Sequence, residues 1–206
     1  MEGYKTLDGQ SQFELEEKHS RFISQAAFAD SEEQALAFLE AVRAQHRTAN
    51  HNVYAYVLRA GARARYSDDG EPAKTSGLPT LEAIQHAGLV DCIVVTTRYF
   101  GGTLLGTGGL VRAYTQAAAG ALAAARTVEV RVCVQGTWTV DYALYETAQK
   151  LLAAAGARVG APVFAARVAL PFTMPAGTEE ALRAQAQELC RGRAELTLSQ
   201  PFHAPF

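Results

Sequence analysis

Five glycines lie between an apolar segment (residues 92–95) and a run of small residues (110–125): Gly101, Gly102, Gly106, Gly108 and Gly109. The apolar segment predicts a buried strand, and the small-residue run predicts a helix. Glycine permits positive φ and leaves backbone N–H groups uncovered, and a helix N-terminus attracts anions. With Arg98 and Arg112 flanking the loop, the pattern suits an anion such as a phosphate. A tight structural crossover, with the helix packed close to the sheet, is the alternative.

The spacing of these glycines excludes two common phosphate-binding loops. No Gly-Lys-Ser/Thr follows them, so a Walker A loop is excluded. They are also not spaced as Gly-x-Gly-x-x-Gly, so the sequence does not support a dinucleotide-binding loop. Any phosphate site here would therefore be of another kind.

A second polar cluster, Ser-Asp-Asp-Gly-Glu-Pro at residues 67–72, holds the carboxylates of Asp68, Asp69 and Glu71. Carboxylates this close can share a cation or act as acid and base, with His51 as a further base. The alternative is structural: the two aspartates hold a turn through bonds to the backbone, and Glu71 pairs with an arginine. The ligand spacing of an EF-hand is absent.

An expected hairpin carries basic and aromatic residues in alternation, a pattern that can hold single-stranded nucleic acid through phosphates and stacking. In the alternative interpretation the aromatic side chains fill the core and the arginines are solvated. The residues concerned are Arg59, Arg63, Arg65, Tyr54, Tyr56 and Tyr66.

The composition is that of an ordinary globular protein, with 206 residues, 49% apolar and 19% charged. A net charge of −2 argues against a broad basic face, so contact with nucleic acid would be local. Three cysteines without a Cys-x-x-Cys pair predict reduced, structural thiols and no structural zinc. We expect no other metal site and no cofactor. Without a signal peptide or an apolar run of membrane length, we expect a cytoplasmic protein that does not contact a membrane.

The expected elements predict an α+β protein with two domains, residues 1–127 and 128–206. The first contains strands at 13–16, 21–28, 53–58 and 63–66, a helix at 31–45 and a helix that starts near Pro79. The second follows the order β-α-β-β-α-β of a ferredoxin-like domain. Its elements are expected at 128–134, 143–155, 158–163, 165–170, 178–190 and 194–198, with a frayed tail at 201–206.

Four segments together resemble the IMPACT/YigZ family in order and spacing: residues 18–22, 51–56, 67–72 and 97–114. The resemblance implies a first domain with the ribosomal protein S5 domain 2-like fold. It also implies a second domain similar to a C-terminal domain of elongation factor G. Eukaryotic relatives are linked to translational control. The family usually has Ser-Gly after the segment at residues 67–72, which we call the acidic loop. This chain has Ala73 and Lys74 there.

Residues and resemblance together predict a binding protein that acts in translation through RNA, the ribosome or a translation factor. In this hypothesis the five glycines, Arg98, Arg112 and Lys74 hold phosphates, with His51 and Tyr54 nearby. The alternative is a hydrolase or phosphotransferase that uses Asp68, Asp69 and Glu71 with His51. A protein–protein adaptor is a third interpretation. The sequence does not define an oligomeric state.

Overall fold

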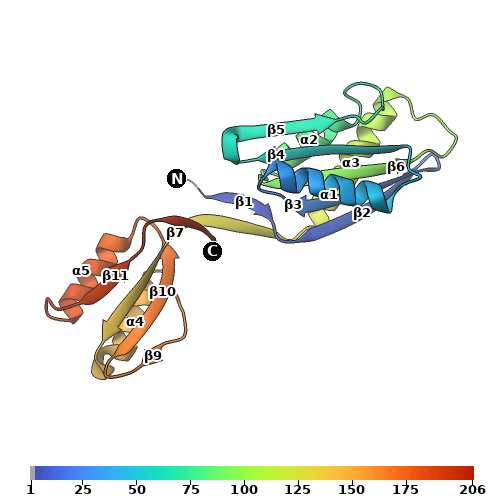
Figure 1. Ribbon diagram of the computed structural model, residues 1–206. Coiled ribbons are helices and arrows are strands. Elements are labelled where there is room, and N and C mark those ends of the chain that lie inside the picture. The colour runs from blue at the N-terminus through green and yellow to red at the C-terminus, as the bar shows by residue number, and fades with distance from the viewer. Residues whose placement is uncertain (1–2) are drawn as a thin grey trace. The chain divides into compact units, whose positions relative to one another are not determined.

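The computed structural model describes residues 3–206, which form two compact units, each with its own sheet and helices (Figure 1). One unit comprises Tyr4–Glu129, and the other is formed mainly by Val130–Phe206. The predicted α+β class is confirmed. A domain boundary at 127/128 stays a prediction. No helix in the described part of the chain is long and apolar enough to cross a membrane.

The first unit is built on a five-stranded antiparallel sheet with β6 (Cys92–Tyr99) in the centre. All of β6 except its last residue is buried, because helices cover both faces of the sheet. A further strand, β1 (Tyr4–Leu7), comes before these strands in the chain and lies outside this five-stranded sheet. It was not predicted. The order of the sheet is β2 (Gln10–Glu17), β3 (Ser20–Phe28), β6, β4 (His51–Leu58) and β5 (Arg63–Ser67).

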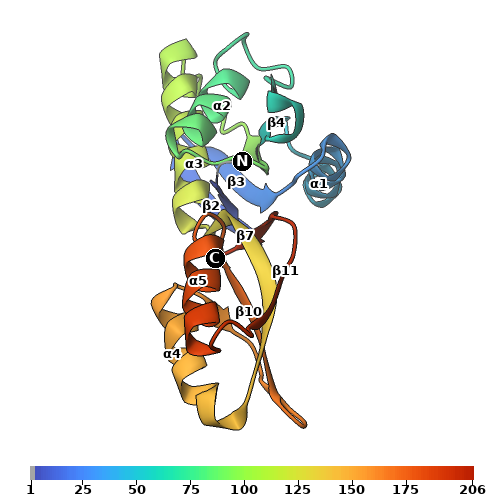
Figure 2. The ribbon, with the colours of Figure 1, turned by 90° about the vertical axis from the view of Figure 1, so that its left-hand side faces the viewer.

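Side chains alternate along β6 between two cores. Ile93 and Val95 pack with α1 (Glu32–Gln45). The N-cap of α1 is Ser31, and its spacing from Gln34 is that of a capping box. Cys92 and Val94 face the opposite side. There α2 (Gly77–His86) and α3 (Thr107–Ala124) cover the sheet (Figure 2). A 3₁₀ turn, Ala60–Ala62, joins β4 to β5.

The second unit has ferredoxin-like topology, as predicted. Its antiparallel strands run in the order β11-β7-β10-β8, and its core is centred on Trp138, Leu152 and Leu170. The elements are β7 (Thr127–Val140), a 3₁₀ turn (Tyr142–Leu144), α4 (Tyr145–Ala154), β8 (Arg158–Val159), β9 (Val163–Phe164), β10 (Val168–Pro175), α5 (Glu179–Leu189), β11 (Glu195–Leu198) and β12 (Phe202–Pro205).

Three details differ from the sequence expectations. The tail is not frayed: Phe202–Pro205 pairs with Val130–Cys133 of β7, which is longer than predicted and offers backbone groups beyond β11. The expected strand at 165–170 instead forms as β10 at 168–175. Helix α3 begins at Thr107, so Gly108 and Gly109 lie in its first turn and not in the preceding loop.

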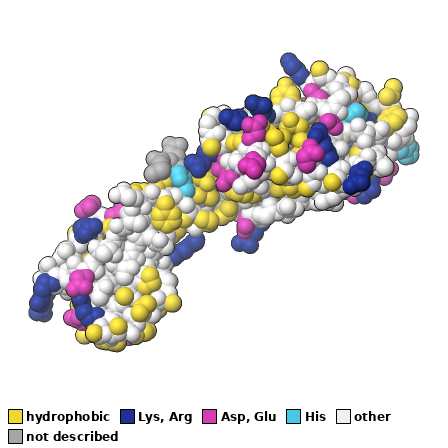
Figure 3. All heavy atoms as spheres, viewed as in Figure 1, with side chains coloured by type: hydrophobic (Ala, Val, Ile, Leu, Met, Phe, Trp, Pro, Cys, Tyr) yellow, Lys and Arg dark blue, Asp and Glu magenta, His cyan; other side chains and the backbone are white. Residues whose placement is uncertain are grey.

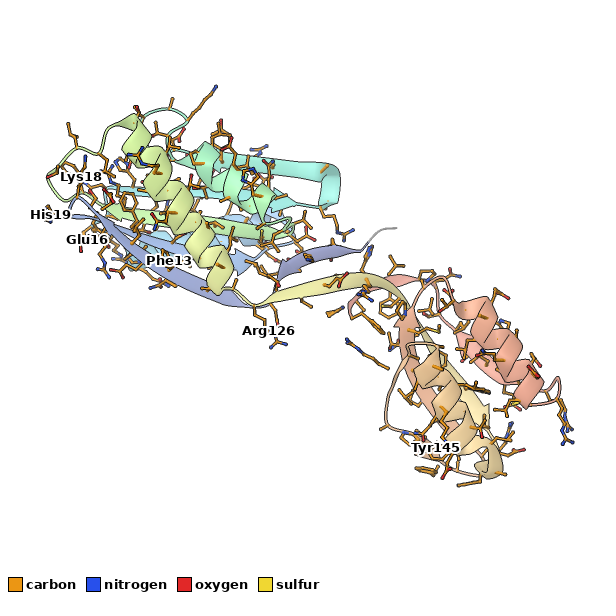
Figure 4. All side chains as sticks on the ribbon, turned by 180° about the vertical axis from the view of Figure 1, so that it is seen from behind. Phe13, Glu16, Lys18, His19, Arg126 and Tyr145 are labelled. Atoms are coloured by element: carbon orange, nitrogen blue, oxygen red, sulfur yellow. The ribbon has the colours of Figure 1, made fainter. Side chains whose placement is uncertain are left out.

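Helix α3 lies close to the edge strand β2 at Gly120, where an added Cβ atom would overlap the ring of Phe13 (Figure 4). Alanine normally stabilises a helix relative to glycine. Here we expect Gly120→Ala to lower the free energy of unfolding by about 1–3 kcal/mol, because the ring has to move. Urea unfolding followed by far-UV circular dichroism measures this free energy. Tryptophan fluorescence does not suit the purpose, because the single tryptophan, Trp138, lies in the other unit.

Gly108→Ala on the same helix is the matched control, because its Cβ would meet only Arg112 Nη1, at 3.8 Å. That variant should be neutral or slightly stabilised. Equal destabilisation of the two variants would contradict close packing as the reason for Gly120.

Candidate functional site at the N-terminus of helix α3

A cavity of about 420 Å³ opens in the first unit where β4, β6, the acidic loop and the start of α3 meet. Its polar lining comes from Asn50, His51, Glu71, Arg98 and Thr107. Its apolar lining comes from Pro72, from Leu110 of α3, and from the loop between β6 and α3 (residues 100–106, the glycine loop). A larger hollow of about 630 Å³ lies on the sheet of the second unit, but Arg158 is its only charged lining residue. We therefore place the candidate site in the smaller cavity, where charged and hydrogen-bonding groups converge.

A buried ion pair between Arg98 and Glu71 lies at the base of this cavity. Arg98 Nη1 donates to Glu71 Oε1 at 2.7 Å, and both side chains are at least 94% buried. The Tyr114 hydroxyl of α3 donates to the same oxygen at 2.8 Å. Burial, reinforced by the Glu71 carboxylate, raises the pKa of Tyr114, so the phenol stays protonated and acts as a donor. Glu71 Oε2 accepts no hydrogen bond from any described residue.

Arg98 makes two further connections. Its Nη2 donates to Ser20 Oγ at 3.3 Å, and the same oxygen accepts the backbone N–H of Gly101 at 3.2 Å. Arg98 Nε is buried and has no partner among the described residues. The guanidinium thus joins β3, β6 and the acidic loop. Its charge is balanced by Glu71, and a phosphate would have to compete with that carboxylate.

His51, the first residue of β4, presents one ring nitrogen to the cavity. Its Nδ1 lies 2.8 Å from the backbone carbonyl of Asp69. A carbonyl only accepts hydrogen bonds, so Nδ1 carries the proton and Nε2 of the neutral ring is an acceptor. Nε2 lies 3.9 Å from Glu71 Oε1. His51 therefore offers the cavity a lone pair.

Asp68 and Asp69 form the acidic loop itself. Asp68 accepts the backbone N–H groups of Lys74, Ser76 and Gly77 and the Ser76 hydroxyl, which satisfies donors at the start of α2. Asp69 accepts the N–H of Asn52 and a guanidinium N–H of Arg43. Of the three carboxylates, only Glu71 lines the cavity. The two aspartates therefore hold the loop through hydrogen bonds, as in the structural alternative given for them in the sequence analysis.

The start of α3 forms one wall of the cavity. Gly106 is its N-cap, with φ 73°, and no side chain of the described residues caps the helix there. Its first backbone N–H groups are therefore open to a ligand. Gly102 also has positive φ, whereas Gly101 packs against the backbone of His19. Gly101 and Gly102 thus permit the tight connection between β6 and α3, and Gly106 leaves the N-terminus of α3 without a side-chain cap.

Other predicted site residues lie outside the cavity lining. Arg112 and Lys74 are exposed, and Arg112 lies beside Gly108 in the first turns of α3. Tyr54 stacks on Tyr56 and packs with the α1 core. The hairpin arginines form ion pairs with acidic side chains: Arg59 with Asp91, and both Arg63 and Arg65 with Glu32.

Sequence reasoning missed several residues that build the site: Ser20, Asn50, Phe100, Thr107 and Tyr114. All of them except Asn50 lie within the segments that carry the family resemblance, which was the available signal. The described residues contain no cluster of three or more His, Cys, Asp or Glu side chains that could hold a metal ion.

Comparison with known proteins agrees with this architecture. Residues 18–122 match the Impact N-terminal domain, and residues 139–193 match a domain of unknown function, DUF1949. The chain is 35% identical to the IMPACT family member YigZ of Escherichia coli, over 87% of this chain and 89% of that protein. The chain belongs to the IMPACT family.

Other relatives match over different lengths. An IMPACT family member of Thermus thermophilus is 55% identical over 51% of this chain and 56% of its own length. The Protein IMPACT homolog of Saccharomyces cerevisiae is 33% identical over 45% of this chain and 37% of its own length. The match to a crystal structure of a hypothetical protein covers 95% of this chain and 97% of that protein's chain, at 34% identity and a TM-score of 0.63.

The Arg98–Glu71 pair leads to a stability prediction. Arg98→Ala leaves a carboxylate buried without its cation, and we expect the free energy of unfolding of the first unit to fall by about 3–5 kcal/mol. Urea unfolding followed by circular dichroism measures the loss. The exposed Arg112→Ala is the control and should change stability by less than about 0.5 kcal/mol. Similar effects of the two changes would contradict a structural role for Arg98.

The acidic loop leads to a pH prediction. Burial alone would raise the pKa of Asp68, but the hydrogen bonds from Lys74, Gly77 and Ser76 outweigh it and hold that pKa below its usual value. As pH falls, the unfolded chain therefore takes up the proton first, and the stability that Asp68 contributes at neutral pH is lost in the acid range. Asp68→Asn should reduce stability at pH 7 and flatten its acid dependence. An unchanged acid dependence would contradict this.

Proposed function

We propose that the first unit binds single-stranded RNA, with a phosphate at the N-terminus of α3 and a base in the adjoining cavity. The uncapped start of α3, which lines a cavity next to an exposed aromatic ring, carries the proposal. Phe100 is 44% exposed and lines that cavity. An aromatic face beside an anion site is what an unpaired nucleotide requires.

Charge supports a small, local site. Figure 3 shows basic and acidic side chains interspersed over the visible face of the first unit, without a continuous basic patch. Because Glu71 neutralises Arg98, we assign the phosphate contacts to the α3 backbone and Arg112, with Lys74 as the next available cation. With about two phosphates neutralised, the slope of log affinity against log salt should be about −1.4.

Binding is favoured over the alternative of catalysis because the Asp68 and Asp69 carboxylates hold the loop. Among the predicted acid–base residues, only Glu71 and His51 line the cavity. The link of eukaryotic relatives to translational control supports RNA of the translation apparatus as the ligand. We therefore propose a role in translation, as an RNA-binding component.

Fluorescence anisotropy with a labelled uridine hexamer tests the proposal across a salt series. Between about 50 and 200 mM salt we expect a loss of affinity of roughly sevenfold. Arg112→Ala should weaken binding and reduce the salt slope by about half, because one of about two phosphate contacts is removed.

Arg126→Ala is the matched control. Arg126 is 82% exposed and lies just beyond the other end of α3 (Figure 4), about 27 Å along the helix from the proposed phosphate site. If both variants weaken binding equally, or if affinity does not depend on salt, the proposed site is wrong. Co-sedimentation with ribosomes, using the same variants, then tests the assignment to translation.

A further inference from the structure

At the base of the cavity, away from the start of α3, two polar atoms without a protein partner are hydrogen-bond acceptors. Glu71 pairs with Arg98 through Oε1, which leaves Oε2 as an acceptor without a partner, and the Glu71 side chain is 97% buried. His51 Nε2, which lies 3.9 Å from the other oxygen of Glu71, Oε1, is a second acceptor, because Nδ1 holds the proton. Arg98 directs its Nη donors to Glu71 and Ser20. This part of the cavity therefore suits a ligand that brings donors.

The charge balance restricts the kind of donor. Arg98 and Glu71 cancel each other at 2.7 Å, so the base of the cavity carries no net negative charge that would attract an ammonium group. A neutral N–H donor fits this environment better, because it needs no counter-charge.

A third polar group supplies a donor. Asn50 Oδ1 accepts the backbone N–H of Phe100 at 2.8 Å, which fixes the orientation of the amide. The Asn50 NH₂ group is then the part left to donate, and Asn50 lines the same cavity. The cavity thus combines two acceptors with one donor.

The apolar lining suits a flat ring. Phe100, Leu105 and Leu110 contribute to it, together with Leu104, which is 80% exposed. An exposed leucine at a cavity loses water contact when a ligand covers it, which favours binding of an apolar ring face. Ring faces between apolar walls and hydrogen bonds at the ring edge are how proteins read unpaired bases.

We propose that this cavity selects guanine among the RNA bases, an inference that rests on the proposed RNA binding. Guanine presents two neighbouring donors, N1–H and the 2-amino group, beside the acceptor O6. Glu71 and His51 match the donors, and Asn50 matches O6. Adenine, cytosine and uracil each present only one donor group on that edge, so one cavity acceptor is left without a partner.

Uridine hexamers with a single central guanine, inosine or adenine test the selection by fluorescence anisotropy on the full chain. We expect the guanine hexamer to bind at least about tenfold more tightly than the adenine hexamer, with inosine between them because it lacks the 2-amino group. GMP and AMP as competitors show whether a free nucleotide suffices: displacement by GMP at concentrations where AMP has no effect supports the same selection.

The variant His51→Phe removes the Nε2 acceptor and keeps a ring of similar size. It should reduce the ratio of guanine to adenine affinity to within about twofold. His86→Phe changes an exposed histidine at the end of α2, away from the cavity lining, and should keep the full ratio. Circular dichroism checks that both variants are folded.

The outcomes separate the two proposals. Equal affinity of the wild-type protein for all hexamers, with binding that depends on salt and on Arg112, overturns guanine selection and leaves RNA binding standing. No binding of any hexamer at low salt overturns both. A preference for guanine that persists in the His51→Phe variant overturns the assignment of His51 as a hydrogen-bond acceptor for the base.

Discussion

The buried pair of Arg98 and Glu71 is the interaction on which the organisation of the first unit depends. It joins the end of the central strand β6 to the acidic loop, and the Tyr114 hydroxyl ties α3 to the same carboxylate oxygen. Burying two charges is costly, so each partner needs the other, and neither can be removed without leaving an unpaired charge in the interior. The loop and helix are therefore held in place by electrostatics as well as by packing.

This constraint also determines what the cavity can recognise. Because Arg98 is engaged, the positive character of the site comes from the α3 N-terminus and from exposed cations at its rim. Because one oxygen of Glu71 is engaged, the other is left as an acceptor. In the proposed RNA site, this pair thus separates the region assigned to a phosphate from the region assigned to the donors of a base.

The four segments that carry the family resemblance converge on this pair. They supply Ser20, His51, Glu71, Arg98 and Tyr114, which lie far apart in the sequence and on β3, β4, the acidic loop, β6 and α3. The glycines between β6 and α3 have structural roles, and phosphate binding at them stays a proposal. Gly101 allows close packing against His19, and Gly106 leaves the helix without a side-chain cap.

Local signals in the sequence determined the α+β class, the ferredoxin-like second unit and the capped start of α1, because periodicity and capping depend on residues a few positions apart. They also placed glycines, acids and arginines in segments of interest. Pairings between distant segments were decided only by the tertiary structure. It engages Arg98 with Glu71, leaves Arg112 exposed, and pairs the tail with β7 instead of letting it fray. The reason is physical: the partner of a buried charge or an unpaired strand edge is chosen by proximity in space, which no local pattern encodes.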